Sequence, residues 1–254
     1  MIRASVHQRS GLFTSKGKQC MTNSLAVILQ RKDIRAEEWT AATLDEILTN
    51  GDNLYTIHNV DTYLMLEDLK PACPNYYKSL HIGNALTGTT LNFHLNKLPY
   101  FTLEEAFNTV LPNDESSCFF TMGSTNPSYS TTIVHESNTY YVFDPHSRSE
   151  MGMSTPDGCA VLTIHNDIKP LSSFFRHISA LIDKKDIPFD VANITSTVDQ
   201  ADDLACQCYR RKYICLTFPV FLVWAIMSSH LKVTLTVVKF AFLNLFQIKM
   251  KVQY

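Results

Sequence analysis

A cysteine, an aspartate and a histidine in this sequence have the types and spacing that thiol-dependent hydrolysis requires. Cys20 stands where a flexible segment containing Gly17 meets a run of apolar residues at helical spacing. A cysteine at the start of a helix lies in the positive end of the helix dipole, which lowers the pKa of the thiol and favours the nucleophilic thiolate. One cysteine does not establish catalysis, because Cys20 could equally be a small buried residue that opens a core helix.

Asp144 and His146 are the candidates for the groups that would activate Cys20. A cysteine protease needs an imidazole that takes and returns the proton, and a second group that holds this imidazole in its working tautomer. The two residues end a predicted strand and are two positions apart, so in extended backbone both side chains point to the same side. His135 is a competing base, but its neighbouring carboxylate, Glu136, would point the other way.

The elements that must position these residues change from helical to strand-like near residue 117. Helices are predicted from Cys20, over residues 36–48 with Gly51 as the stop, over residues 61–69, and after Thr102, where Glu105 completes a capping box. Strands follow at residues 118–122, 130–135, 139–143 and 160–164, and a helix follows at residues 172–182. A short connection joins the second and third strands, so these two should form an antiparallel hairpin.

Composition limits the partners and the compartment. The chain has 254 residues with 22 Lys and Arg against 24 Asp and Glu, so its charge gives no case for a nucleic-acid partner. Seven cysteines without a secretory signal at residues 1–11 predict free thiols in a reducing compartment, the cytoplasm or the nucleus. The cysteine and histidine spacings make no convincing zinc site, and we expect no metal or cofactor.

The cysteine motif and the Asp-Pro-His motif, in this order, resemble those of a known family. This is the deubiquitinase domain of the herpesvirus large tegument protein, with related domains in some large DNA viruses and mobile elements. The similar segments are ASVHQ at residues 4–8, GKQCMTNS at residues 17–24 and YVFDPHSR at residues 141–148. The resemblance covers roughly residues 4–183.

This resemblance implies a fold, a reaction and a set of roles. The fold would be α+β and papain-like, with helices packed on a mostly antiparallel sheet. The reaction would cleave peptide or isopeptide bonds after the C-terminal glycine of ubiquitin or a ubiquitin-like protein. Cys20 would be the nucleophile, His146 the general base and acid, Asp144 its orienter, and Gln8 the donor to the oxyanion. The spacing from Gln8 to Cys20 is about one residue shorter than in the family, so Gln19 stays open as an alternative amide donor.

We divide the chain into a peptidase domain at residues 1–185, a polar and basic linker at residues 186–212 and a hydrophobic tail at residues 213–254. Residues 214–248 are largely apolar but interrupted by Pro219. They are open to three interpretations: a membrane anchor, a second buried element or a non-native extension. Two other functions also stay open, a catalytically silent interaction module and a cysteine peptidase with a substrate other than ubiquitin. The sequence leaves the oligomeric state open.

Overall fold

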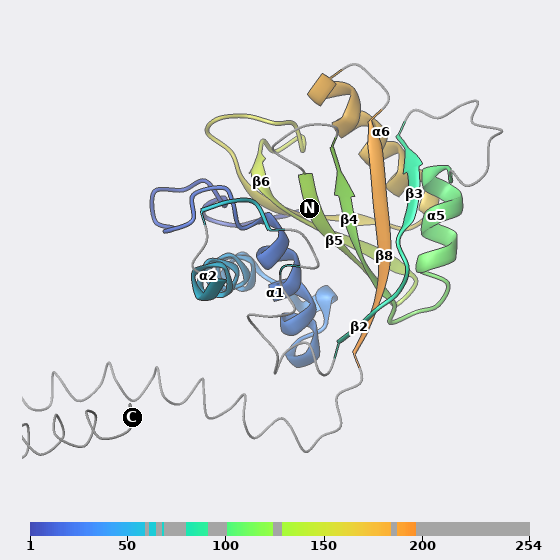
Figure 1. Ribbon diagram of the computed structural model, residues 1–254, viewed down its shortest axis with the longest axis horizontal. Helices are drawn as coiled ribbons and strands as arrows, with labels where there is room; N and C mark the ends of the chain where they lie inside the picture. Colours follow the sequence, from blue (N-terminus) through green and yellow to red (C-terminus); the bar gives the residue numbers. More distant parts are fainter. Residues whose placement is uncertain are drawn as a thin grey trace, which may run out of the picture. The chain divides into compact units, whose positions relative to one another are not determined.

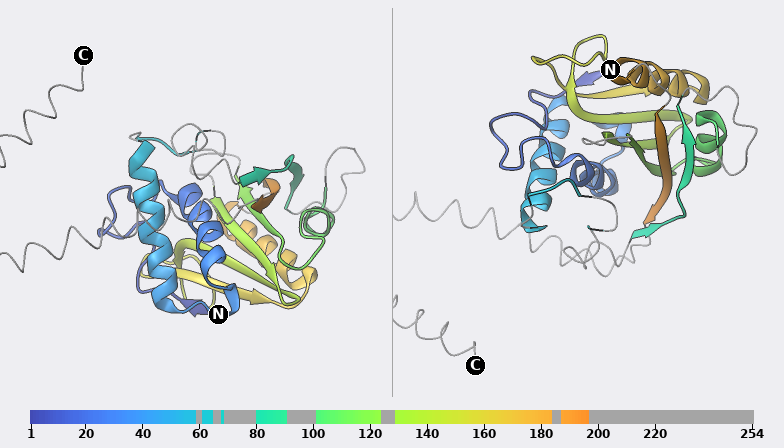
Figure 2. Two further views of the ribbon diagram at one scale, coloured as in Figure 1. Left: turned by 90° about the horizontal axis from the view of Figure 1, so that it is seen from below. Right: turned by 45° about the horizontal axis from the view of Figure 1, so that its top comes forward.

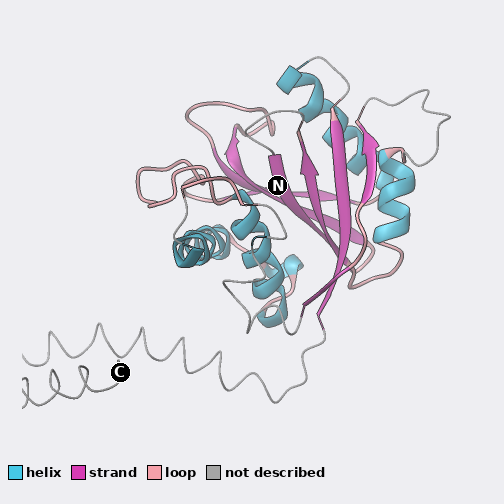
Figure 3. Ribbon diagram, viewed as in Figure 1, coloured by secondary structure: helices cyan, strands magenta, loops and turns pink. Residues whose placement is uncertain are grey.

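The computed structural model describes residues 1–58, 61–64, 68, 80–90, 101–123, 129–183 and 187–196 (Figures 1 and 3). Its helices are α1 (Cys20–Asp33), the short 3₁₀ helix η1 (Ala36–Glu38), α2 (Ala41–His58), α5 (Leu103–Val110) and α6 (Ile168–Asp183). Its strands are β1 (Ile2–Arg3), β2 (Leu80–Ile82), β3 (Leu86–Thr89), β4 (Ser117–Met122), β5 (Tyr129–Glu136), β6 (Thr139–Arg148), β7 (Cys159–His165) and β8 (Pro188–Ser196).

The strands form one sheet in the order β1-β7-β6-β5-β4-β8-β2, and β3 also pairs with β8. Neighbouring named strands are antiparallel throughout. The predicted hairpin is confirmed as β5 and β6, whose register pairs Thr132 with Phe143 and Glu136 with Thr139. The pairing of β6 with β7 shifts register between Asp144 and Arg148, so the strand is irregular where the Asp-Pro-His motif lies.

Helices cover both faces of the sheet, α1 and α2 on one side and α5 and α6 on the other (Figures 1 and 2). Consecutive strand residues point to opposite faces, so they enter different cores. Phe119 packs with α1 and α2, whereas Phe120 packs with α5 and α6. Large apolar side chains thus fill both layers, and the sheet forms a rigid platform for α1.

Helix α2 runs through Gly51 to His58, so the prediction that Gly51 ends this helix is wrong. A Cβ atom at position 51 would overlap the side chain and backbone of Asn23 on α1. The glycine therefore permits the close approach of two helices, and its role is packing. The predicted cap of α5 is confirmed, because Thr102 accepts from the Glu105 backbone N–H while the Glu105 carboxylate accepts from the Thr102 backbone N–H.

The predicted domain boundary at residue 185 is wrong by one strand. Residues 188–196 were expected to be linker, but they form β8, which pairs with β2, β3 and β4. Its buried residues include Phe189 and Val191, which pack with α5 and α6, and Ile194, which packs with α1 and α2. Residues 1–197 form one compact unit.

The hydrophobic tail at residues 213–254 lies outside the described residues, as do residues 65–67 and 69 of the helix predicted at residues 61–69. Residues 61–64 are described and are not helical, so the predicted helix is wrong over these four residues. Among the helices that are described, none has both the length and the apolar character needed to cross a membrane.

Candidate active site

Cys20 is the first residue of α1, and its side chain is buried. Burial raises the pKa of the Cys20 thiol to about 11, although the backbone N–H groups of Met21 and of Cys20 itself act in the opposite direction. The effect of the helix start that the sequence suggested is therefore present, but the cost of burying a charge outweighs it. The resting thiol is protonated at neutral pH and needs a base to become a nucleophile.

Asp144 and His146 form a hydrogen-bonded pair on β6. Asp144 Oδ1 lies 2.8 Å from His146 Nδ1 and also accepts from the His146 backbone N–H at 2.9 Å. Asp144 is fully buried, whereas the side chain of His146 is 21% exposed. With Nδ1 held by the carboxylate, Nε2 is the ring nitrogen left to exchange a proton.

The second oxygen of Asp144 is also fully engaged. Oδ2 accepts from Arg148 Nε at 2.6 Å and from the Tyr129 hydroxyl at 2.8 Å. Burial would by itself raise the pKa of Asp144, but the charges and hydrogen bonds of Arg148 and His146 outweigh it and hold this pKa well below its usual range. Asp144 is therefore a carboxylate throughout the neutral pH range, as an orienting group must be.

Tyr129 and Arg148 were missed as members of the site by sequence reasoning. The Tyr129 ring stacks on the imidazole of His146, with centroids 4.7 Å apart and planes inclined by 19°. The Arg148 guanidinium lies 5.5 Å from the centroid of the same tyrosine ring. Arg148 follows Asp144 by four residues and could have been noticed, whereas Tyr129 is brought in from the far end of a different strand and has no local signal.

Gln8 connects the nucleophile helix with the strand of the base. Its backbone N–H donates to Pro145 O at 3.0 Å, and its backbone oxygen accepts from the Gly17 N–H at 2.9 Å. Its side-chain oxygen accepts from Asn23 Nδ2, on the first turn of α1, at 3.4 Å. Because its oxygen accepts from Asn23, the NH₂ group is the part of the Gln8 amide that can act as a donor towards a substrate.

Gln19 is buried beside the cysteine and uses its amide differently. Its side-chain oxygen accepts from the Gly17 N–H at 3.2 Å, and its NH₂ group is buried without a hydrogen-bond partner among the described residues. Gly17 adopts a φ of 88°, which an L side chain rarely adopts. The Gly17 N–H thus donates both to the backbone oxygen of Gln8 and to the side-chain oxygen of Gln19.

Helix α1 is fixed on β5 so that its two ends meet the two ends of that strand. Near the start, Ser24 Oγ lies 3.4 Å from Ser130 Oγ, and Thr132 Oγ1 donates to Ser24 O at 2.9 Å. The negative charge of Asp144 acts on the Cys20 thiol and adds to the rise of its pKa. The structure thus brings the Asp144 and His146 pair to the Cys20 end of α1.

His135 lies towards the other end of β5. At roughly 3.3 Å per residue, it is about 17 Å along the strand from Ser130. Its Nδ1 lies 2.9 Å from Asn113 O, and its Nε2 lies 3.8 Å from Asp114 Oδ1. This places the competing histidine away from the start of α1.

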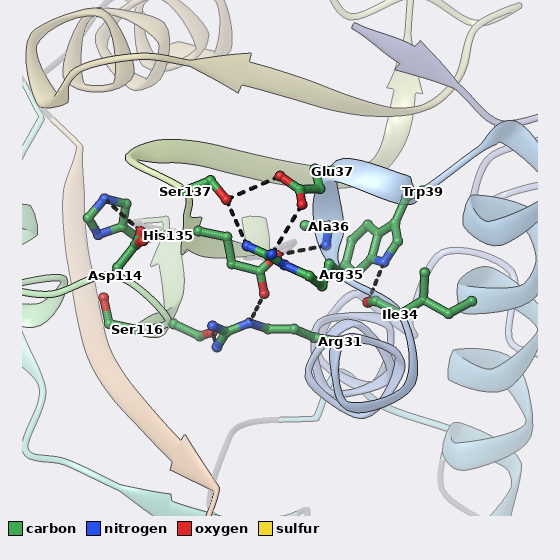
Figure 4. A network of polar contacts seen from close by, with 12 residues as sticks. Arg31, Ile34, Arg35, Ala36, Glu37, Trp39, Asp114, Ser116, His135 and Ser137 are labelled. Atoms are coloured by element: carbon green, nitrogen blue, oxygen red, sulfur yellow. Dashed lines mark hydrogen bonds and ion pairs between the residues drawn. The ribbon is translucent and has the colours of Figure 1, made fainter.

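A polar cluster, which we call the Arg31–Glu136 cluster, occupies this end of the strand (Figure 4). Glu136 accepts from Arg31 Nε at 2.5 Å and from the Ala36 backbone N–H at 2.8 Å. Arg35 donates to Ser137 Oγ at 2.7 Å. These contacts tie the end of α1 and η1 to the β5–β6 turn, so their role is structural. Among the described residues, no group of three or more His, Cys, Asp or Glu side chains could hold a metal ion.

Comparison with solved structures gives the class of fold. The chain is similar to the ubiquitin-specific protease encoded by murine cytomegalovirus tegument protein M48, solved in complex with a ubiquitin-based suicide substrate. The TM-score is 0.59 at 16% sequence identity, over 78% of this chain and 88% of that chain. The Pseudomonas avirulence protein AvrPphB matches with a TM-score of 0.46 at 8% identity, over 70% of this chain and 91% of that chain. The predicted α+β, papain-like cysteine peptidase fold is confirmed.

The family follows from the sequence comparison. Residues 3–196 match the model of the herpesvirus tegument protein, N-terminal conserved region. The chain belongs to this family, which confirms the predicted resemblance. A comparison with curated proteins finds no match. The roles of Cys20, Asp144, His146 and Gln8 remain predictions.

Proposed function

We propose that this protein is a thiol-dependent deubiquitinase in which Cys20 is the nucleophile and His146 the general base. The observation that carries the proposal is the His146–Asp144 hydrogen bond of 2.8 Å, made by a fully buried aspartate whose pKa is held low. In this pair the orientation of the imidazole is fixed and the aspartate is ionised. The pair lies near the start of the helix that carries Cys20. Packing alone does not require a buried carboxylate at this position, because a buried carboxylate costs stability unless it is fully paired.

The reaction begins with a neutral thiol. Because burial raises the pKa of Cys20, the thiol is almost entirely protonated at pH 7. We infer that Nε2 of His146 removes the proton as the sulfur attacks the carbonyl carbon of the substrate. Asp144 then stabilises the imidazolium through Nδ1–H, and the two electrons of the carbonyl π bond move to oxygen.

The developing oxyanion needs a donor that is already in place. The NH₂ group of Gln8 is the proposed donor, because its own oxygen is held by Asn23 and its backbone is tied to Pro145, next to the base. His146 next gives its proton to the leaving amine, which leaves an acyl-enzyme on Cys20. Water, deprotonated by His146, then releases the carboxylate product and restores the thiol.

The proposed substrate is ubiquitin or a ubiquitin-like protein. Family membership and the likeness to the M48 ubiquitin-specific protease, which was captured with a ubiquitin-based substrate, support this choice. Ubiquitin ends in a narrow Gly-Gly tail, which suits a nucleophile that is buried and is reached only by a slender chain. The 3% exposure of Cys20 agrees with such restricted access.

Hydrolysis of ubiquitin carrying a C-terminal fluorogenic group tests the proposal. We expect turnover by the wild type and none by Cys20→Ser, with a ubiquitin-like protein and a short Gly-Gly peptide as parallel substrates. Turnover of the peptide without either protein substrate would favour a cysteine peptidase of other specificity. A folded wild type that turns over none of the three would favour a catalytically silent interaction module.

A further inference from the structure

Tyr129 makes two separate contacts with the candidate catalytic pair. Its hydroxyl donates to Asp144 Oδ2 at 2.8 Å, and its ring stacks on His146 at 4.7 Å. The residue is 5% exposed and is the first residue of β5. One side chain therefore contacts both members of the pair, each through a different part of the molecule.

The Tyr129 hydroxyl helps to fix which oxygen of the Asp144 carboxylate faces His146. Tyr129 and Arg148 both donate to Oδ2, whereas His146 occupies Oδ1 with its ring nitrogen and its backbone N–H. Burial, together with the nearby charge of Asp144, raises the pKa of Tyr129 well above its usual value, so the phenol remains a donor. Because Oδ2 already accepts two hydrogen bonds, the carboxylate cannot rotate relative to His146 without losing some of these bonds.

The ring acts on the second member of the pair. A stacked neighbour fixes the plane of the imidazole, and rotation about its χ2 would break both the stack and the hydrogen bond from Nδ1 to Asp144. When His146 takes up the proton, the imidazolium lies against the electron-rich face of a phenol, an arrangement that favours the cation. The two contacts thus support orientation and charge at the same step of the reaction.

We propose that Tyr129 is a positioning residue of the catalytic site, whose hydroxyl fixes Asp144 and whose ring fixes His146. The inference rests on the proposed function, since it assigns Tyr129 to the reaction of Cys20. It separates two contributions that can be removed one at a time: Tyr129→Phe deletes the hydroxyl and keeps the ring, and Tyr129→Leu deletes both.

The chain provides a matched control in Tyr140. Its ring stacks on His135 with centroids 4.2 Å apart and planes inclined by 11°, but this pair lies at the other end of the hairpin. Tyr140→Phe and Tyr140→Leu make the same chemical changes to a stacked tyrosine away from the proposed site. Thermal unfolding of the four variants identifies any that lose the fold, and the Phe variant keeps the test valid should Tyr129→Leu unfold.

Two measurements on the full chain test the inference. In steady-state hydrolysis of the fluorogenic ubiquitin substrate, we expect Tyr129→Phe to lower kcat about tenfold and Tyr129→Leu about 100-fold, with KM nearly unchanged. In NMR spectra recorded at one fixed pH, we expect the ring-proton resonances of His146 to carry the upfield ring-current shift of the stacked Tyr129 ring in the wild type and in Tyr129→Phe, and to lose it in Tyr129→Leu. The Tyr140 variants should leave both quantities unchanged.

The inference is overturned if the folded Tyr129 variants keep the wild-type kcat, or if Tyr129→Leu keeps the wild-type ring-proton shifts of His146. It is also overturned if the Tyr140 variants reproduce the same losses, since the effect would then be a general one on the hairpin. The NMR measurement requires no ubiquitin. A wild type that fails to hydrolyse ubiquitin would therefore count against the proposed function, while the ring-proton shifts of His146 would still decide the contacts of Tyr129.

Discussion

His146 and His135 lie on the two strands of one hairpin, and each imidazole stacks on a tyrosine of the opposite strand. His135 and Tyr140 are directly paired in the β5–β6 ladder. Continuing the same register would set Tyr129 opposite His146. The two stacks are close in geometry, with centroids 4.2 Å apart for His135 and 4.7 Å for His146. What differs is the group that each Nδ1 meets.

The Nδ1 of His146 meets an ionised, fully buried carboxylate, whereas the Nδ1 of His135 meets the backbone oxygen of Asn113. A carbonyl can fix a tautomer as well as a carboxylate can, but it brings no full negative charge to stabilise an imidazolium. The charge of Asp114 is 3.8 Å from the other nitrogen of His135, on a half-exposed side chain. A stacked, oriented histidine is therefore common to both regions, and the buried charge of Asp144 distinguishes the proposed base.

The largest expected effect is the loss of activity in His146→Ala, which is compared with His135→Ala. His146→Ala should lower turnover of the ubiquitin substrate by about 10²–10⁴-fold, because proton transfer by a positioned base contributes that much. His135→Ala should stay near the wild-type rate, since it removes a contact about 17 Å along β5 from the Cys20 end. Steady-state rates of both folded variants decide the matter, and the reverse ranking would mean that the other histidine is the base.

Gln8 should come next in size. Gln8→Ala should lower kcat by about 10²–10³-fold, as loss of one oxyanion donor does, while KM barely changes because the interaction forms in the transition state. Gln8→Glu should be as severe or worse, since a carboxylate repels the oxyanion and offers no donor.

Gln19→Ala is the comparison that sharpens this prediction, because Gln19 is the other buried amide near Cys20. A wild-type rate in both Gln8 variants, together with a large loss in Gln19→Ala, would transfer the donor role to Gln19.

The last of these predictions concerns stability and its dependence on pH, and not the rate of catalysis. Arg148→Met should lower the free energy of unfolding at pH 7 by about 3–5 kcal/mol, because it leaves Asp144 buried with one charged partner fewer. Arg31→Met, in the Arg31–Glu136 cluster, should cost less, about 1–3 kcal/mol, because the Arg31 side chain is 17% exposed against 4% for Arg148.

The pH dependence follows from the sign of the shift. The pKa of Asp144 is depressed in the folded protein, so its contribution is present above the unfolded pKa of about 3.9 and is lost as the pH falls towards the folded value. Urea unfolding of wild type and Arg148→Met should therefore differ most at neutral pH, and the difference should shrink in acid. A difference that is independent of pH would mean that Arg148 does not stabilise the charge of Asp144.

Local patterns were sufficient to predict much of this fold. The Thr102–Glu105 cap, the β5–β6 hairpin and the strands around them depend on neighbouring residues, and each is confirmed. The start of a helix at Cys20 is confirmed for the same reason. The Asp144 and His146 pair could also be predicted, because the two residues lie two positions apart on one strand.

Contacts between distant segments could not be predicted in the same way. Strand β8 was taken for a linker because its polar residues are as frequent as its buried ones, and its partners come from three other strands. Tyr129 reaches Asp144 and His146 only through the pairing of β5 with β6. The pKa of Cys20 was expected to fall and instead rises, because burial depends on the packed fold and not on the position of the residue in its helix.

The most direct test of the account is covalent capture by ubiquitin that carries a C-terminal electrophile. We expect one adduct per chain in the wild type, mapped by peptide mass spectrometry to Cys20. We expect none in Cys20→Ala, and strongly slowed capture in His146→Ala but not in His135→Ala. An adduct on Cys118 or Cys159, or labelling that persists in Cys20→Ala, would contradict the assignment of Cys20 as the nucleophile.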